Sequence, residues 1–214
     1  MHIKNYYNIT WLIIFLIVIF TIKMNIYPED ESESYINYLI SLFKENTIII
    51  SNGFDFPVGK PNAKKYYVAQ KFGEKNPDFG YHMHLGEDWN GVRGGNTDLG
   101  DPVFAVSNGI VSYAKDSGIG WGNIVMIIHC ISGKTGNKYV TSLYGHLREM
   151  DVAEGDFVQK GQKIGAIGNV NGTYFAHLHF EIRNIVTMPI GGGYSNDLTG
   201  FLNPTDFIKR NRKL

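Results

Sequence analysis

Several features are scarce in this sequence of 214 residues, and each shortage excludes a kind of protein. Cys130 is the single cysteine, so no disulfide can form within the chain, and no cysteine follows the apolar N-terminal run where a lipoprotein carries its anchor. The formal net charge is zero, and Lys and Arg are dispersed except in a basic, solvated tail predicted at 209–214. Because recognition of nucleic acid needs a basic patch, we expect no nucleic-acid partner.

Charge is absent from one stretch near the N-terminus. No charged side chain occurs from Asn5 to Ile22, and residues 11–20 read WLIIFLIVIF. This apolar core is shorter than the ~20 residues that span a bilayer, so it is typical of a signal sequence. The first alanine is Ala63, so no Ala-x-Ala cleavage site follows. We therefore predict a hydrophobic helix at 1–27 that is a signal anchor, in preference to a cleaved signal peptide.

The charges on either side of this run predict the location of the chain. Lys4 precedes the run, and acidic residues follow it between 29 and 33, so the bulk of the chain should be exported. The predicted localisation is the cell envelope. The chain is expected either to be anchored in the cytoplasmic (inner) membrane and to face outward, or to be exported to the periplasm or the extracellular side.

The rest of the chain divides into a short connecting region and one domain. Residues 28–34 read PEDESES, which predicts an acidic linker. Apolar residues then recur at helical spacing from Tyr35, which predicts a short amphipathic helix ending at 44–46 that packs on the domain or on the membrane surface. We assign 28–50 to this linker and helix and 51–208 to a single domain, the size for which one core suffices.

The domain is expected to be mainly β. All 25 glycines lie after residue 47, where they separate short apolar runs. Two strands around a tight Asn-Gly turn are predicted at 102–114, and a second hairpin is predicted at 158–167 with its turn at Lys160 and Gly161. Further strands are predicted at 123–130, 139–147 and, as the last strand, 177–183. His129 and Cys130 are interpreted as strand residues without a role in metal binding.

Two short motifs carry groups that can bind a metal. Residues 84–88 place His84 and Asp88 in a loop or at a strand end, because Gly86 argues against a helix. Residues 177–181 place His177 and His179 two apart on a strand, so both should face one cleft. Imidazole and carboxylate suit Zn²⁺, and a catalytic zinc site uses three protein ligands. The remaining histidines are then free to move protons.

Each motif is weak alone, but together with Tyr-Gly-His-Leu at 144–147 they resemble the lysostaphin/LytM-type peptidoglycan zinc metalloendopeptidases. The motifs H-x-G-x-D, Y-x-H-L and H-L-H-F-E occur in that order at 84–88, 144–147 and 177–181. Matching glycine-containing segments lie at 100–109, 120–125 and 155–165. The resemblance extends over about 70–207 and implies an antiparallel, β-sheet-rich metallopeptidase fold of the duplicated-hybrid-motif type.

The resemblance also implies a function and roles for individual residues. His84, Asp88 and His179 match the zinc ligands, and His146 and His177 match the two catalytic histidines. The implied activity is hydrolysis of peptide cross-links, with peptidoglycan stem peptides or cross-bridges as the partner. One segment departs from the pattern: 169–176 replaces a turn rich in Ser, Thr and Gly. This loop is expected to line the groove, so substrate preference is affected rather than catalysis.

Other residues near the two motifs are predicted not to bind the metal. His82 is expected at the surface or in the groove rather than as a fourth ligand. Glu87 and Glu181 are expected to point to opposite faces or to solvent, with contact to a ligand as the alternative. Residues 191–193 are expected to form a wall of the groove.

The general base is assigned to His177 and the stabilisation of the oxyanion to His146, and the reverse assignment stays open.

Two other classes of protein are alternative interpretations of this sequence. The chain could be a non-catalytic envelope protein of LytM type that binds peptidoglycan or regulates an amidase. The presence of all three ligands and both histidines argues against this reading, because a scaffold has no need for them. A lipoyl-type carrier with Lys160 at a hairpin turn would leave the metal motifs unexplained.

Overall fold

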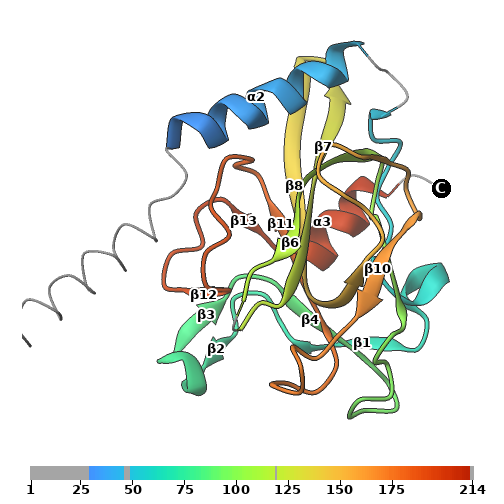
Figure 1. The fold of residues 1–214 in the computed structure, drawn as a ribbon, viewed down its shortest axis with the longest axis vertical. Coiled ribbons are helices and arrows are strands. Elements are labelled where there is room, and N and C mark those ends of the chain that lie inside the picture. The colour runs from blue at the N-terminus through green and yellow to red at the C-terminus, as the bar shows by residue number, and fades with distance from the viewer. Residues whose placement is uncertain (1–28, 46–48, 119, 213–214) are drawn as a thin grey trace, which may run out of the picture.

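The computed structural model describes residues 29–45, 49–118 and 120–212 (Figure 1). The strands form two antiparallel sheets, which confirms the expectation of a mainly β fold with few helices. The hydrophobic helix expected at 1–27 lies outside the described residues. Within the described ranges, neither α2 nor α3 has the length and apolar character that crossing a bilayer demands.

The elements follow one another with short connections. The helices and helical turns are α2 (Glu29–Glu45), η2 (Gly59–Ala63), η3 (Pro77–Phe79) and α3 (Pro204–Asn211). The strands are β1 (Tyr66–Gln70), β2 (Lys75–Asn76), β3 (His82–His84), β4 (Glu87–Gly91), β5 (Pro102–Phe104), β6 (Gly109–Asp116), β7 (Asn123–Gly133), β8 (Gly136–Met150), β9 (Phe157–Val158), β10 (Lys163–Ile167), β11 (Leu178–Arg183), β12 (Tyr194–Ser195) and β13 (Phe201–Leu202). The large sheet runs β1-β4-β11-β8-β7-β6-β9, with β10 on β8 and β5 and with β13 on β11, and the small sheet runs β12-β3-β2.

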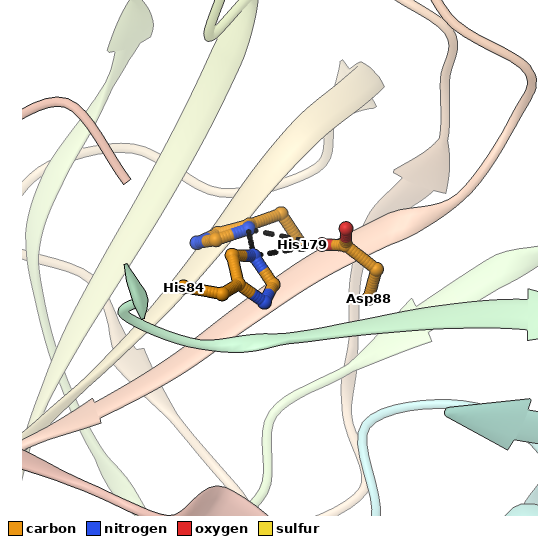
Figure 2. A group of neighbouring side chains, drawn as sticks. All are labelled: His84, Asp88 and His179. Carbon is orange, nitrogen blue, oxygen red and sulfur yellow. Dashed lines mark hydrogen bonds and ion pairs between the residues drawn. The ribbon is translucent and has the colours of Figure 1, made fainter. Parts of the chain in front are cut away.

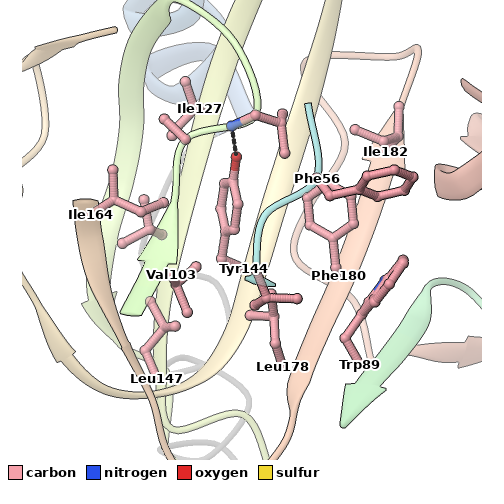
Figure 3. Packing of buried hydrophobic residues seen from close by; sticks show 14 of the residues in the cluster. Phe56, Trp89, Val103, Ile127, Tyr144, Leu147, Ile164, Leu178, Phe180 and Ile182 are labelled. Carbon is pink, nitrogen blue, oxygen red and sulfur yellow. Dashed lines mark hydrogen bonds between the residues drawn. The ribbon is translucent and has the colours of Figure 1, made fainter. Parts of the chain in front are cut away.

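The main core lies where β7, β8 and β11 face the segment 54–58 and strands β5 and β10 (Figure 3). Leu178, Phe180 and Ile182 of β11 belong to this core, because alternate residues of a strand share one face. The residues between them therefore occupy the other face of β11. This alternation separates the apolar core from the polar side chains of the site.

Strand β7 is buried on both faces, which explains its long uninterrupted apolar run. Ile127 belongs to the main core, whereas its neighbours Ile128 and Cys130 share a second cluster with Leu39 and Phe43 of α2. Figure 1 shows α2 lying across the β7 and β8 end of the molecule. The amphipathic helix therefore packs on the domain.

Both predicted hairpins are wrong in their pairing. The strands at 102–114 do not pair with each other, because β5 pairs with β10, while β6 pairs with β7 and β9. Strands β9 and β10 are likewise paired to different neighbours rather than to each other. Asn108 does not form a tight turn of positive φ: its side chain donates to the carbonyl of Ile50 and accepts from the backbone N–H of Lys160. It therefore joins three separate segments.

Gly109 has a packing role rather than a turn role. A Cβ at this position would lie 2.8 Å from Nδ1 of His129 and 2.7 Å from a methyl of Ile127. Strand β6 can approach β7 this closely only because residue 109 has no side chain.

The two ends of the described chain also differ from prediction. The acidic segment expected as a linker is helical from Glu29. The predicted helix end near residue 45 is confirmed. The basic residues Lys209 and Arg210 are exposed, but they belong to the last turn of α3, and Arg212 lies 3.0 Å from Asp55, so 209–212 continue the domain. The last two residues of the predicted tail lie outside the described residues. Two short strands, β12 and β13, follow the strand predicted as the last.

A buried polar chain crosses the sheet beside the main core. His129 donates from Nδ1 to the carbonyl of Asn108 at 2.9 Å, so its Nε2 accepts from the hydroxyl of Ser142 at 2.7 Å. The oxygen of Ser142 lies 3.1 Å from the hydroxyl of Tyr144, which accepts the backbone N–H of Val106 at 3.0 Å. Burial lowers the pKa of His129 to about 4. The folded chain therefore holds this imidazole neutral.

Replacing His129 with Gln should remove one source of acid instability. In the unfolded chain His129 has its ordinary pKa of 6.5, whereas in the folded chain its pKa is about 4. Between pH 6.5 and pH 4 the unfolded chain therefore binds a proton that the folded chain does not. The contribution of His129 to the free energy of unfolding is thus full above pH 6.5 and is lost as the pH falls from 6.5 to 4. The loss from this group is about 3 kcal/mol. The difference in free energy of unfolding between wild type and His129→Gln, measured by urea titration, should shrink from pH 7 to pH 4.5. A difference that stays constant with pH would contradict this account.

Candidate metal centre

The pairing of β4 with β11 brings the side chains of Asp88 and His179 together. Strand β4 pairs antiparallel with β11, and in this register Asp88 lies opposite His179. His84 reaches the same place from the end of β3, four residues before Asp88. Gly86 makes the short crossing between β3 and β4 feasible, because a Cβ there would lie 3.0 Å from Nε2 of His179 and 2.8 Å from Cγ of Glu181.

The three side chains point their donor atoms at one another (Figure 2). Nδ1 of His179 lies 3.0 Å from Nε2 of His84 and 3.0 Å from Oδ1 of Asp88, and the last two atoms are 3.3 Å apart. A tetrahedral zinc ion with bonds of about 2.0–2.1 Å separates its ligand atoms by about 3.3 Å. The spacing and the chemistry of this donor set therefore fit a zinc ion held by three protein ligands.

Electrostatics at these donors also suit a cation. Burial alone would lower the pKa of His179, but its hydrogen bonds to Asp88 and Glu181 outweigh burial and raise the pKa to about 9. Burial also opposes ionisation of Asp88, yet hydrogen bonds from His179 and His84 hold the pKa of this carboxyl below its ordinary value. A proton on His179 thus balances the carboxylates, and a bound divalent ion would replace that proton.

Glu181 supports His179 from behind. Its Oε1 accepts from Nε2 of His179 at 2.9 Å, and its Oε2 accepts from Nε of the fully buried Arg183 at 2.7 Å. Although burial raises the pKa of Glu181, the positive charge of Arg183 and the bond from His179 lower it below its usual range. Arg183 also donates to the carbonyls of Pro189 at 2.7 Å and Ile190 at 2.6 Å. This series of hydrogen bonds from His179 to Arg183 therefore reaches the backbone just before residues 191–193, which were expected to form a wall of the groove.

Glu87 faces away from the ligands, as expected, but it is buried rather than solvent-exposed, whereas Glu181 contacts a ligand residue, which is the alternative left open for both. Glu181 lies two residues after His179 on one strand, so the two share a face, and its side chain is fully buried. Glu87 is also buried, and it accepts from the hydroxyl of Thr205 at 2.7 Å. Burial raises the pKa of Glu87. Of the two carboxylates, Glu181 is the one that contacts a donor residue of the site.

The two remaining histidines lie beside the donors. The rings of His146 and His177 are 4.7 Å apart, and Nε2 of His177 lies 3.9 Å from Oδ1 of Asp88. Nδ1 of His146 donates to the carbonyl of Trp121 at 3.1 Å, and Nδ1 of His177 donates to that of Phe175 at 2.8 Å. In each ring the unprotonated nitrogen is therefore Nε2, which can accept a proton.

The backbone at His146 is unusual for a strand. Its φ of 61° lies in the left-handed region, which is uncommon for a residue other than glycine. The carbonyl of Trp121 holds both its backbone N–H, at 3.0 Å, and its ring. Burial, with the nearby His179 and His177, lowers the pKa of His146 to about 3. His146 is thus fixed in place as a neutral imidazole.

Trp121 is a residue of the site for which the sequence motifs predicted no role. Besides holding His146, it donates from Nε1 to the carbonyl of Gly191 at 2.8 Å, and its ring lies 5.1 Å from that of His179. Gly145 is the sequence feature connected with this tryptophan, because a Cβ at residue 145 would lie 3.0 Å from the indole ring of Trp121. The H-L-H motif alone cannot reveal a tryptophan that arrives from a distant loop.

A cleft of about 520 Å³ opens over these groups. Its lining residues are Gln70, Asn76, Asp78, Phe79, Asp88, Gly120, Trp121, His146, Tyr174, His177, His179, Gly191, Gly192, Gly193 and Tyr194. The expected wall at 191–193 and the expected contribution of the loop 169–176, through Tyr174, are both observed. His82 is exposed, as expected, and is not part of the lining.

Comparison with protein families gives a match to peptidase family M23 over residues 82–193. The DD-carboxypeptidase/endopeptidase Mpg of Neisseria meningitidis serogroup B is 35% identical over 108 residues, which are 49% of this chain and 23% of Mpg. The murein hydrolase activator NlpD of Escherichia coli is 35% identical over 103 residues, which are 45% of this chain and 25% of NlpD. The chain thus spans about a quarter of the length of these two relatives.

Solved structures give the same picture. The catalytic domain of the antimicrobial peptidase lysostaphin from Staphylococcus simulans superposes with a TM-score of 0.51 at 27% identity, covering 67% of this chain and 92% of that domain. A zinc-containing peptidase from Vibrio cholerae has a TM-score of 0.50 at 27% identity, covering 69% of this chain and 41% of the other. The resemblance drawn from the sequence motifs is confirmed.

Replacing Glu181 with Gln should weaken zinc binding by roughly 10- to 100-fold, because His179 loses the carboxylate that orients its ring and raises its basicity. Affinity is measured by competition with a chelating dye at pH 7, with thermal unfolding to verify the fold. Glu87→Gln is the matched control, since that carboxylate is also buried but contacts Thr205 instead of a donor. Equal zinc affinity of Glu181→Gln and wild type would show that the contact has no such role.

Proposed function

This chain belongs to peptidase family M23, and we propose that it is a zinc-dependent endopeptidase that hydrolyses peptide cross-links of bacterial peptidoglycan. The observation that carries the proposal is the convergence of His84, Asp88 and His179 at zinc-ligand spacing, with two further imidazoles at the same cleft. A purely structural cluster would not need the second pair.

The proposed mechanism begins with the ligands. His84 Nε2, Asp88 Oδ1 and His179 Nδ1 would hold the zinc ion, and Glu181 would keep the proton on Nε2 of His179 so that Nδ1 faces the metal. When bound, zinc supplies a Lewis acid for the scissile carbonyl and lowers the pKa of a bound water toward neutrality. The protein contributes the fixed geometry and the groups that move protons.

His146 and His177 divide the proton transfers. Both present an unprotonated Nε2, but His146 is the more deeply buried ring and is held neutral. The fixed orientation of its ring, with Nδ1 on the carbonyl of Trp121, favours His146 as the acceptor of the proton from water at Nε2, and burial, which lowers its pKa, opposes this role. His177 lies closer to the mouth of the cleft, where it can exchange protons with solvent and deliver one to the leaving amine. The assignment of the general base to His146 is the reverse alternative that the sequence left open, whereas the role of His177 as proton donor to the leaving amine is additional to it.

The proposed setting is the cell envelope. The relatives named as a murein hydrolase activator and as a DD-carboxypeptidase/endopeptidase support peptidoglycan as the partner, with its stem peptides or cross-bridges in the cleft. Residues 1–27 are proposed as a signal anchor or signal peptide that brings the chain to the membrane, and the domain from residue 51 onward is proposed as the peptidase.

A regulatory role is the second candidate. It is favoured by the likeness to NlpD, a protein named as a murein hydrolase activator, which shares 35% identity over 103 residues. In this alternative the same cleft would bind peptidoglycan or an amidase without hydrolysis. The full set of donors and both histidines favours the enzyme, because binding alone does not require a site for activated water.

Incubating the zinc-loaded full chain with cross-linked muropeptides should release new amine ends. Chelation, or replacement of His179 with Ala, should abolish the release, because the metal activates both water and carbonyl. The products are measured by amine labelling and mass spectrometry. Binding of muropeptides without any new amine ends would favour the regulatory role, and cleavage by the metal-free chain would refute the zinc mechanism.

Replacing His146 with Ala should retain zinc while lowering the cleavage rate by about 10²–10⁴-fold, the usual loss on removing a general base. Bound zinc is quantified by metal analysis and cleavage by the amine assay. His82→Ala is the matched control, because this exposed histidine lies outside the cleft lining and should change neither quantity. Loss of metal from His146→Ala would mean that His146 is a ligand.

A further inference from the structure

We propose that Asp78, an exposed residue at the rim of the cleft, forms a subsite for a primary ammonium group of the substrate peptide. The inference rests on the proposed function of this cleft and narrows its substrate class. The preferred peptide carries an unmodified primary amine.

The carboxylate of Asp78 stands on a well-held turn. Asp78 lies in η3, between β2 and β3, and its backbone N–H donates to Oδ1 of Asn76 at 2.9 Å. The next residue, Phe79, stacks face to face on Tyr194, with ring centroids 4.0 Å apart and an interplanar angle of 8°. The hydroxyl of Tyr194 donates to Gln70 at 2.8 Å and accepts from Asn76 at 3.2 Å. These contacts join η3 to β12 and fix the rim.

The charge of Asp78 favours a cation as its ligand. Among the described lining residues the carboxylates are Asp78 and Asp88, and neither Lys nor Arg is present. Asp88 belongs to the donor set of the metal centre. Asp78 has no ion pair with any residue in the described ranges, so its charge is available to a ligand. Asp78 is therefore the carboxylate of the described lining that lies outside the metal centre and has no charged partner, and such a group attracts a cation.

The neighbouring aromatic pair suits an ammonium group in particular. Phe79 is 41% exposed, so part of its ring remains open to a ligand although its other face is covered by Tyr194. An ammonium group gains from an aromatic face as well as from a carboxylate. A peptide carboxylate at the same place would meet repulsion from Asp78. A peptide supplies such an amine at its amino terminus or on a basic side chain.

The test uses a pair of ligands that differ in one charge. A cross-linked muropeptide dimer with one free primary amine is compared with the same dimer after N-acetylation. Equilibrium binding and cleavage by the zinc-loaded full chain are both measured, for wild type and for Asp78→Asn. Glu33→Gln is the matched control, since it removes the same charge from an exposed position on α2, outside the cleft lining.

Wild type should prefer the free amine by roughly threefold to fivefold in Kd and in kcat/KM, the size expected of an exposed ion pair. The preference should vanish in Asp78→Asn, persist in Glu33→Gln and weaken in high salt. Equal binding of the two dimers by wild type, or an unchanged preference in Asp78→Asn, overturns the inference. Absence of cleavage of either dimer overturns the peptidase proposal alone, because the binding ratio still tests the subsite.

Discussion

The antiparallel pairing of β4 with β11 is the constraint on which the site depends. It places Asp88 opposite His179, so two donor atoms from segments 91 residues apart lie 3.0 Å from each other. A register shift of one residue would turn His179 toward the apolar core, because successive side chains of a strand face opposite ways. The burial of Leu178 and Phe180 in the main core therefore also fixes the orientation of the metal donors.

The polar face of β11 links the metal centre to the wall of the cleft. His179, Glu181 and Arg183 form a continuous buried chain, and Arg183 ends on two backbone carbonyls. Buried charges of this kind are costly unless every partner is supplied, so the chain is a poor general source of stability. Its value lies in orientation: one nitrogen of His179 is fixed by Glu181, and the other is left for the metal.

The cleft has two unlike sides. On one, backbone carbonyls accept hydrogen bonds from His146 and His177, burial holds His146 neutral, and Trp121 ties His146 to the wall. On the other, the stacked pair Phe79 and Tyr194 carries a free carboxylate beside it. The first side suits proton transfer and the second suits recognition. Family membership alone does not separate hydrolysis from binding, because function resides in the site rather than in the fold.

Periodicity and motifs, which are local properties, were enough to predict the β-rich domain, the end of the helix at residue 45 and the residue types able to bind a metal. The folded chain was needed to show that β5 pairs with β10, that Glu181 supports His179 and that Trp121 holds His146. The physical reason is that a period of two shows which residues of a strand share a face, but not which distant segment covers that face. Partners are chosen by packing of the whole chain.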